Sequence, residues 1–209
     1  NKMEERGILV DKKHFLNMRT EIEKRLREIE AEVTSLTGSS INLNSPKQLS
    51  TLLFDTLGLK TNKKRKESGA FTTNAETLEG LRDAHPVIPL ILEQREIQKI
   101  LSTYVESILE RIGSDGRIHA KFLQHGTTTG RFSSADPNMQ TLPASGKWGK
   151  QVRHGFVADK GHVFIGCDYS QIELRVLAML SGDRLLRESF ERGDDIHASV
   201  ASLVFGVPQ

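Results

Sequence analysis

Residues 163–175 read VFIGCDYSQIELR, and they are the most informative part of the second half of the chain. Its first five residues form a short apolar run of the kind that makes a buried β-strand. Helical spacing follows, and its apolar positions are Ile172, Val176, Leu177 and Leu180. A buried strand that passes directly into a helix predicts an α+β region, with Asp168 at the junction between the two.

Asp168 needs a physical explanation. Stripping the water from an ionised carboxylate is costly, so this side chain cannot point into a dry sheet without compensation. The carboxylate can reach an open cleft and hold a hard cation such as Mg²⁺, or it can cap the N-terminus of the helix that follows. The local pattern leaves both arrangements open.

The first half of the chain has the pattern of helices alone. Over residues 13–36, apolar side chains recur at spacings of three and four, which is one stripe on a helix that Gly38 can end. A second helix is expected to begin after Ser45, and a capping-box pattern at residues 73–76 starts a third, which Pro86 breaks. A long helix follows, with the packing residues Ile91, Ile97, Leu101, Tyr104, Val105, Ile108 and Ile112.

The pattern changes after residue 116. Residues 117–124 alternate enough to be a strand, and residues 125–142 are small, polar and glycine-containing, which predicts a loop. Beyond the stretch quoted first, helices are expected at residues 170–180, 183–192 and 196–205. Asp194 or Asp195 can cap the last of them.

Length and composition restrict the classes of function. The chain has 209 residues, with 29 Lys and Arg against 27 Asp and Glu, so its formal net charge is only +2. No run approaches the ~18–20 uninterrupted apolar residues of a membrane span, so no membrane partner is expected. A single cysteine, Cys167, excludes an internal disulfide and a CxxC-type zinc site. Walker, GxGxxG, GxSxG and HExxH motifs are absent, which removes several common nucleotide-binding and hydrolase classes.

Residues 168–175, DYSQIELR, resemble motif A of the family A DNA polymerases, the bacterial polymerase I type. Further stretches resemble the same family, in the same order along the chain. They are residues 7–11, 42–45, 102–104, 129–134, 136–140, 180–183 and 195–197. The resemblance is therefore collinear over essentially the whole chain.

The fold class that this resemblance implies is α+β, an all-helical thumb followed by part of an antiparallel-sheet palm, truncated before the fingers. Residues 1–12 would be a palm-linked segment that leads into the thumb. Residues 13–110 would be the helical thumb with a basic tip loop, and residues 111–209 the N-terminal part of the palm with motif A.

The resemblance also implies the residues of the active site. Asp168 matches the catalytic aspartate that binds both Mg²⁺ ions, with Mn²⁺ as an alternative ion, and the carbonyl of Tyr169 matches a further metal ligand. Glu173, Gln171 and His197 match the nucleotide-binding site, where Glu173 is the steric gate that leaves no room for a ribose 2′-hydroxyl. Standing alone, Glu173 would be a solvated helix position and His197 an ordinary surface histidine.

Two groups of residues match DNA contacts of the family. Arg131, Asn138 and Gln140 would donate hydrogen bonds to the minor groove of the duplex. Purine N3 and pyrimidine O2 are acceptors there in every base pair, so these donors would test whether a pair has the correct shape without recognising its sequence. A basic run at the thumb tip would contact phosphates, which gives salt-sensitive affinity for any sequence. That run is Lys63, Lys64, Arg65 and Lys66. In isolation these features would be a polar surface loop and a solvated charge run.

The function that the resemblance implies is template-directed DNA synthesis by a DNA-directed DNA polymerase. A nucleotide would pass from a dNTP to a primer 3′-hydroxyl by two-metal-ion catalysis. The partners would be a primer–template duplex, a dNTP and the missing C-terminal polymerase portion, on the same or a separate polypeptide. One aspartate carries too little charge for two Mg²⁺ ions, so this fragment alone is expected to be inactive.

Two other classes of function stay open. The chain could be a duplex DNA-binding module without chemistry, or a metal-dependent nuclease that uses Asp168 with Glu173 or Asp183. The resemblance implies a cytoplasmic location at the bacterial nucleoid, with an organellar or phage origin as an alternative.

Overall fold

The computed structural model describes residues 2–61 and 70–206, and the chain forms two compact units. The first unit covers Asn1–His162 and the second Val163–Gln209. The strands found among the described residues all belong to the first unit, whereas the regular structure of the second unit is helical.

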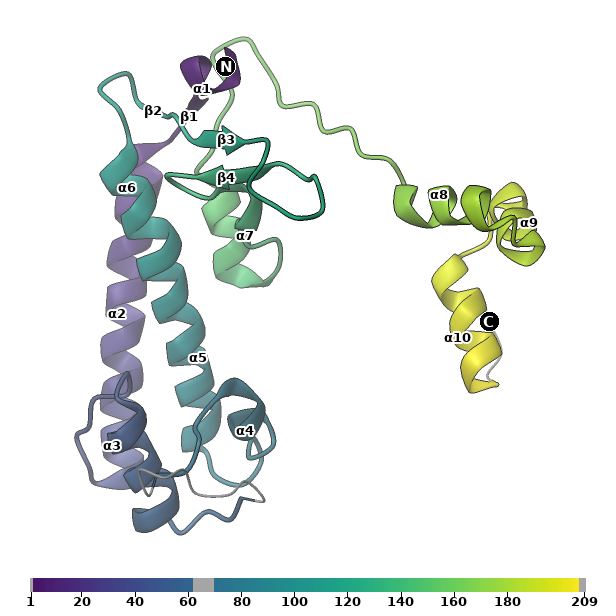
Figure 1. Cartoon of the computed structure of the whole chain (residues 1–209). Coiled ribbons are helices and arrows are strands. Elements are labelled where there is room, and N and C mark those ends of the chain that lie inside the picture. Colours follow the sequence, from purple (N-terminus) through teal and green to yellow (C-terminus); the bar gives the residue numbers. More distant parts are fainter. Residues whose placement is uncertain (1, 62–69, 207–209) are drawn as a thin grey trace. The chain divides into compact units, whose positions relative to one another are not determined.

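A pair of long helices forms the stalk of the first unit. Helix α2 (Lys12–Thr37) and helix α5 (Val87–Ile100) lie side by side and run in opposite directions (Figure 1). Helix α5 continues through a π-helical segment, η2 (Leu101–Glu106), into α6 (Ser107–Arg111). Both helical stretches of the stalk were predicted from apolar spacing and are confirmed.

The apolar stripe of α2 faces the core, and its buried residues are Phe15, Met18, Ile22, Ile29 and Val33. Burying a side chain of this size contributes about 1.5–3 kcal/mol, so the stripe is a main source of the helix's stability. The Asp11 side chain caps the start of α2 by accepting a hydrogen bond from the backbone N of His14. Gly38 ends the helix at φ 67°, a left-handed conformation that favours glycine.

An arginine joins the two stalk helices. Arg25 Nε and Nη2 donate to the two carboxylate oxygens of Glu93, each over 2.8 Å, and Nη1 donates to Glu32 over 2.8 Å. The hydrogen bonds to Glu93 and Glu32 raise the pKa of Arg25, and the bond from Arg25 lowers the pKa of Glu93. A bidentate pair restricts how the helices rotate against each other. Its net stabilisation is about 1 kcal/mol or less, since both groups are partly exposed.

Shorter helices pack at the end of the stalk that lies away from the strands: α3 (Pro46–Ser50), π-helical η1 (Thr51–Thr56) and α4 (Ala75–Glu79) (Figure 1). Ser45 caps α3 as predicted, since its side chain accepts from the backbone N of Gln48. The buried residues of this end include Leu49, Leu52, Leu53 and Leu78.

The capping box predicted at residues 73–76 is wrong by one position. Asn74 caps α4 instead of Thr73, because its Oδ1 accepts a hydrogen bond from the backbone N of Thr77 over 3.0 Å. Thr73 is buried, and the guanidinium of Arg95 donates to both its carbonyl and its hydroxyl oxygen. Its hydroxyl therefore faces an arginine and not the helix terminus.

Two small antiparallel sheets lie at the other end of the stalk. Strand β1 (Ile8–Leu9) pairs with β2 (Arg117–Ile118), and β3 (Lys121–Leu123) pairs with β4 (Ser133–Ala135). In the first sheet Ile8 lies opposite Ile118, and in the second Phe122 lies opposite Ser134. Helix α7 (Gly146–His154) packs against α5, and a bridge joins Val10 to Phe156.

The strand predicted at residues 117–124 and the loop predicted at residues 125–142 need correction. The strand is interrupted at His119 and Ala120, since its first half pairs with β1 and its second half with β4. At this interruption the imidazole of His119 contacts the N-terminal helix α1 (Lys2–Arg6). The loop contains β4 and a 3₁₀ turn, η3 (Met139–Thr141). Strand β4 has the sequence Ser-Ser-Ala, which carries no apolar pattern, so only its pairing with β3 makes it a strand. Helices α1 and α7 were not predicted.

The second unit contains three helices, each near its predicted position: α8 (Ile172–Ser181), α9 (Arg184–Arg192) and α10 (Ile196–Phe205). Asp183 caps α9 by accepting from the backbone N of Leu186, and Asp195 caps α10 by accepting from the backbone N of His197 and of Ala198. Gly182 ends α8 and Gly193 ends α9, both in the left-handed conformation.

The buried strand predicted at residues 163–167 is wrong. This segment has no strand partner among the described residues, and Val163 and Ile165 are 79% and 83% exposed. A strand needs a neighbour for its backbone N–H and C=O groups and a layer against each apolar face. The described part of the chain supplies neither to this segment.

No helix among residues 2–61 and 70–206 is long and apolar enough to cross a membrane.

His119 links the N-terminal helix to the first sheet. Its Nδ1 lies 2.7 Å from the carbonyl oxygen of Glu4, and its Nε2 lies 3.0 Å from Oδ2 of Asp115. Both partners are acceptors, so both ring nitrogens must carry a proton to satisfy them. The hydrogen bonds to Glu4 and Asp115 raise the pKa of His119, and the bond from His119 lowers the pKa of Asp115.

The stability of the first unit should therefore depend on pH through His119. A histidine pKa that is raised by folding stabilises the protein below the unfolded pKa, and this contribution disappears as the pH rises through the folded pKa. We expect the urea midpoint of unfolding to fall as the pH rises above the ordinary histidine pKa of ~6.5. His119→Gln should flatten this part of the profile, whereas the exposed His125→Gln should retain it. An equal slope in both variants would contradict the assignment.

Candidate functional site

Asp168 and Tyr169 lie four and three residues before Ile172, the first residue of α8, in the second unit, and both are exposed. Asp168 is not the N-cap of that helix, since Gln171 occupies this position. No hydrogen bond or ion pair joins the Asp168 carboxylate to another residue that the structure describes, so its oxygens are open to an external ligand. The capping alternative for Asp168 is therefore wrong.

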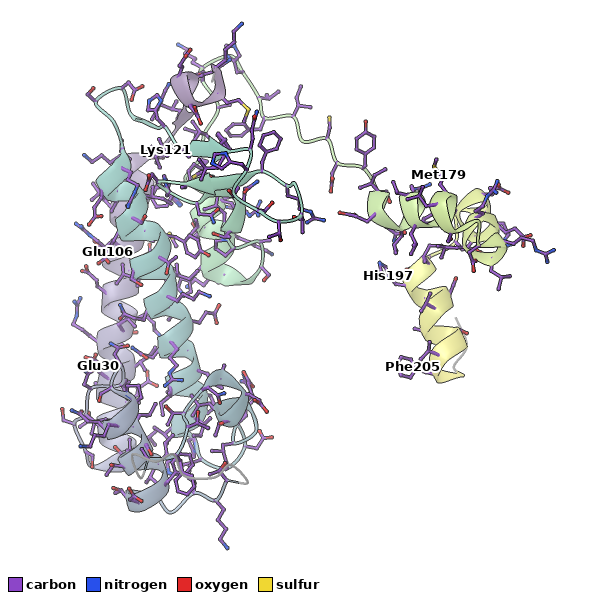
Figure 2. The ribbon with its side chains drawn as sticks, in the orientation of Figure 1. Glu30, Glu106, Lys121, Met179, His197 and Phe205 are labelled. Carbon is purple, nitrogen blue, oxygen red and sulfur yellow. The ribbon has the colours of Figure 1, made fainter. Side chains whose placement is uncertain are left out.

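The other residues predicted to bind the nucleotide belong to the same unit. Gln171 is half-buried, and Glu173 is exposed in the first turn of α8, five residues after Asp168. His197 is exposed at the start of α10, where its backbone N donates to Oδ1 of Asp195 over 2.9 Å (Figure 2). The imidazole of His197 is thus presented from a capped helix terminus.

The donor set around Asp168 fits a divalent cation in kind but not in number. A carboxylate and a backbone carbonyl are the hard oxygen ligands that Mg²⁺ prefers. Within the described parts of the chain, however, no three His, Cys, Asp or Glu residues are grouped closely enough to hold a metal ion. Asp168 and Tyr169 would therefore supply a part of a coordination sphere.

Arg131 lies in the loop that joins β3 and β4 in the first unit, and it is exposed. The hydroxyl of Thr127 donates to the Arg131 carbonyl oxygen over 2.7 Å, and the hydroxyl of Thr129 donates to that of Thr127. Gly130 adopts φ 74°, which allows the chain to turn immediately before the arginine. The backbone at Arg131 is therefore held while its side chain faces solvent.

Asn138 and Gln140 follow β4 and are also exposed. The buried Ser134 holds the segment that carries them. Its hydroxyl donates to the Pro137 carbonyl over 3.2 Å and accepts from the backbone N of Met139 over 3.1 Å. Asn138 Oδ1 accepts from the backbone N of Gln140, so the amide nitrogen of Asn138 remains as a donor towards solvent. A donor is what the predicted contact with the minor groove requires.

The structure thus groups the predicted residues within units. Arg131, Asn138 and Gln140 come from segments next to the β3–β4 sheet of the first unit, and Asp168 and the predicted nucleotide-binding residues come from the second. The basic run Lys63, Lys64, Arg65 and Lys66 lies outside the described residues.

Sequence reasoning missed a cation at the end of the stalk that carries α3 and α4. A hollow of about 640 Å³ is lined by Lys47, Asp55, Thr73 and Arg95, among others. Burial lowers the pKa of Arg95, whose guanidinium bonds to Thr73. The signal in the sequence was a single arginine between the apolar positions Ile91 and Ile97, but only the structure shows that it is partly buried.

The family model for DNA polymerase family A matches residues 12–209 of the chain. A DNA polymerase I, thermostable, from Thermus aquaticus is 44% identical over 208 residues, which cover 99% of this chain and 25% of that protein. A DNA polymerase I from Caldicellulosiruptor bescii is 45% identical over 206 residues and 24% of its length. The chain therefore spans about a quarter of the length of these relatives.

Similarity extends to solved structures. The polymerase domain of Pol1 from M. smegmatis, in complex with a DNA primer-template and dNTP, has a TM-score of 0.85 and 38% sequence identity. The similarity covers 99% of this chain and 36% of that one.

Replacing Ser134 should test how the Asn138 segment is held. Ser134→Ala leaves the Met139 N–H and the Pro137 carbonyl without their partner, at a cost of about 1–3 kcal/mol. We expect a lower free energy of unfolding in urea and faster amide hydrogen exchange at residues 138–140. The matched control is Ser133→Ala, whose side chain alternates to the other face of β4. If both variants behave alike, Ser134 does not organise the segment.

Proposed function

The chain belongs to DNA polymerase family A, and from this membership we propose that it takes part in template-directed DNA synthesis as the thumb and the first part of the palm. The reaction is transfer of a nucleotide from a dNTP to the 3′-hydroxyl of a primer. Residues 13–110 would be the thumb, entered through residues 1–12, and residues 111–209 the palm portion. The bacterial relatives support a site of action at the nucleoid.

The observation that supports this proposal most is the exposure of Asp168 and its lack of a capping role. The aspartate lies inside the segment that matches the family, it is exposed, and it does not cap the helix that follows. A carboxylate left open in this way is suited to bind a cation. The neighbouring carbonyl of Tyr169 adds a second oxygen donor on the same stretch of backbone.

We assign Asp168 and the Tyr169 carbonyl as ligands of divalent metal, two Mg²⁺ ions in the complete site. Such ions lower the pKa of a hydroxyl nucleophile and neutralise a triphosphate and its leaving group. The protein's own part is to hold these two oxygens at one point of the backbone. The lack of a third ligand among the described residues supports the need for further carboxylates from another portion of the enzyme.

Exposed apolar side chains of the second unit support the same need. Met179 on α8 and Phe205 on α10 are 77% and 76% exposed, and residues 163–167 are exposed as well (Figure 2). Surfaces of this kind are usually covered in the native assembly. We propose that the remaining palm and the fingers, on the same or a separate polypeptide, cover them.

Glu173, Gln171 and His197 are assigned to the incoming nucleotide. A carboxylate on the first turn of α8 can fill the space beside the sugar and exclude a 2′-hydroxyl, which would select dNTPs over rNTPs. The exposed imidazole of His197 can donate to phosphate oxygens. The M. smegmatis polymerase domain, whose structure contains dNTP, supports this assignment by similarity.

Arg131, Asn138 and Gln140 are assigned to the minor groove of the primer–template duplex. Their exposure and the fixed backbone beneath them suit donors that must meet acceptors common to all base pairs. Lys63, Lys64, Arg65 and Lys66 are assigned to phosphates, where each cation would add to the salt dependence of binding.

A duplex-binding module without chemistry is the second candidate, favoured by the incomplete metal site of the described residues. A nuclease that pairs Asp168 with Asp183 is less well supported. Asp183 already caps α9 through its side chain, which restricts its use as a metal ligand.

The test is primer extension with labelled duplex, Mg²⁺ and dNTPs, first with the chain alone and then with a C-terminal polymerase portion added. We expect extension only from the completed enzyme. Asp168→Asn, which removes the charge and keeps the shape, should lower the rate by about 10³-fold or more while duplex binding survives. Asp183→Asn is the control, because asparagine also caps a helix. Strand cleavage would support the nuclease, and binding without turnover the module.

Sugar selection tests Glu173 separately. In the completed enzyme, Glu173→Ala should lower the ratio of kcat/KM for dNTP over rNTP by about 10- to 100-fold, because the space for a 2′-hydroxyl opens. Glu173→Gln keeps the volume of the side chain and should retain most of the selection. An unchanged ratio in the alanine variant would remove Glu173 from the role of gate.

A further inference from the structure

The turn between Asp168 and α8 is held in an unusual way. Gln171, the N-cap residue of α8, has φ 53° and ψ 42°, a left-handed conformation that residues other than glycine rarely adopt. Its side chain makes no capping hydrogen bond. A strained residue without a cap persists only where the surrounding structure holds it. Something other than the usual cap must therefore hold this turn.

Arg175 supplies the missing contact. Its Nε donates to the carbonyl oxygen of Ser170 over 2.9 Å, which carries the side chain back past the start of its own helix. A cation near the N-terminus of a helix meets the positive end of the helix dipole, so this position is unfavourable without compensation. The Ser170 carbonyl provides a part of that compensation.

Phe190 of α9 provides the rest. The guanidinium carbon of Arg175 lies 4.5 Å from the centroid of the Phe190 ring, which is a cation–π contact. Helices α8 and α9 pack against each other, so the ring approaches the guanidinium from a second helix. Arg175 has no ion pair with a carboxylate among the described residues, unlike Arg184 and Arg192 of α9, which pair with Glu188. We call the contacts of Arg175 with Ser170 and Phe190 the clamp; they join a turn to a neighbouring helix and are not an ion pair.

We propose that Arg175, stacked on Phe190 and bonded to Ser170, is a positioning residue that fixes the direction in which Asp168 and Tyr169 present their oxygens. Ser170 is two residues from Asp168, so a fixed Ser170 carbonyl restricts the peptide units on which both oxygen donors are carried. The consequence for catalysis rests on the proposed function, whereas the clamp itself does not.

The chemistry of arginine explains why no other residue serves here. The planar guanidinium can lie over a ring while Nε donates in the plane to a carbonyl. A lysine at residue 175 would keep the charge but would offer no planar group and no donor along the stem. Loss of the ring or of the guanidinium should therefore release the same turn.

The first experiment measures amide hydrogen exchange in the 209-residue chain, with no ligand. Arg175→Lys and Phe190→Leu should each speed exchange at residues 169–172 by about tenfold or more, and the double variant should be no faster than either single variant, because both remove one unit. Arg187→Gln, an exposed arginine on α9, is the control and should leave exchange unchanged. Exchange in either variant equal to that of the control, or additive effects, would overturn the clamp.

The second experiment measures extension in the completed enzyme. Arg175→Lys should lower kcat by about 10- to 100-fold, with KM for dNTP changed less than about threefold, and should raise the Mg²⁺ concentration needed for half-maximal rate. Normal kcat and Mg²⁺ dependence together with fast exchange would show that the clamp does not position Asp168. Absence of extension by the unsubstituted completed enzyme would instead contradict the proposed function, and the exchange result would still decide the clamp.

Discussion

Asp168, the proposed metal ligand, has to stay accessible to an ion and yet point in one direction, and these demands oppose each other. Covering Asp168 would hold it still but would strip its water at a large cost in free energy. The chain leaves the side chain exposed and restrains the backbone beside it, through Arg175, Ser170 and Phe190. The strained conformation of Gln171 lies within the same restrained turn.

In the first unit too, exposed side chains are carried on a backbone that neighbouring groups hold in place. Asn138 is exposed, while the buried Ser134 bonds to the backbone on both sides of it. Arg131 is exposed, while Thr127 holds its carbonyl. In each segment a short polar contact fixes the backbone and leaves the long donor side chain exposed to solvent. A surface that must accept duplex DNA of any sequence needs donors that are placed by the fold and not by the ligand.

Helices were predicted well because the forces that form them are local. The stripe of α2, the Ser45 cap and the Asp195 cap involve residues within a few positions of each other, so spacing in the sequence reports them directly. Strands depend on a partner far along the chain. The apolar run at residues 163–167 was therefore predicted as a strand and is not one, whereas β4 was missed because only β3 makes it a strand. The roles assigned to Asp168, Glu173 and Arg131 remain predictions.

Residue types and short spacings were enough to predict the family resemblance, most helices of both units except α1 and α7, and the identity of the candidate site residues. The tertiary structure established that Asp168 does not cap α8, and that Arg175 bonds to Ser170 and contacts the ring of Phe190 from α9. It also decided that Thr73 faces Arg95 instead of capping α4. Each of these outcomes depends on a backbone torsion or on a side chain brought from another helix, and a linear pattern of residues specifies neither.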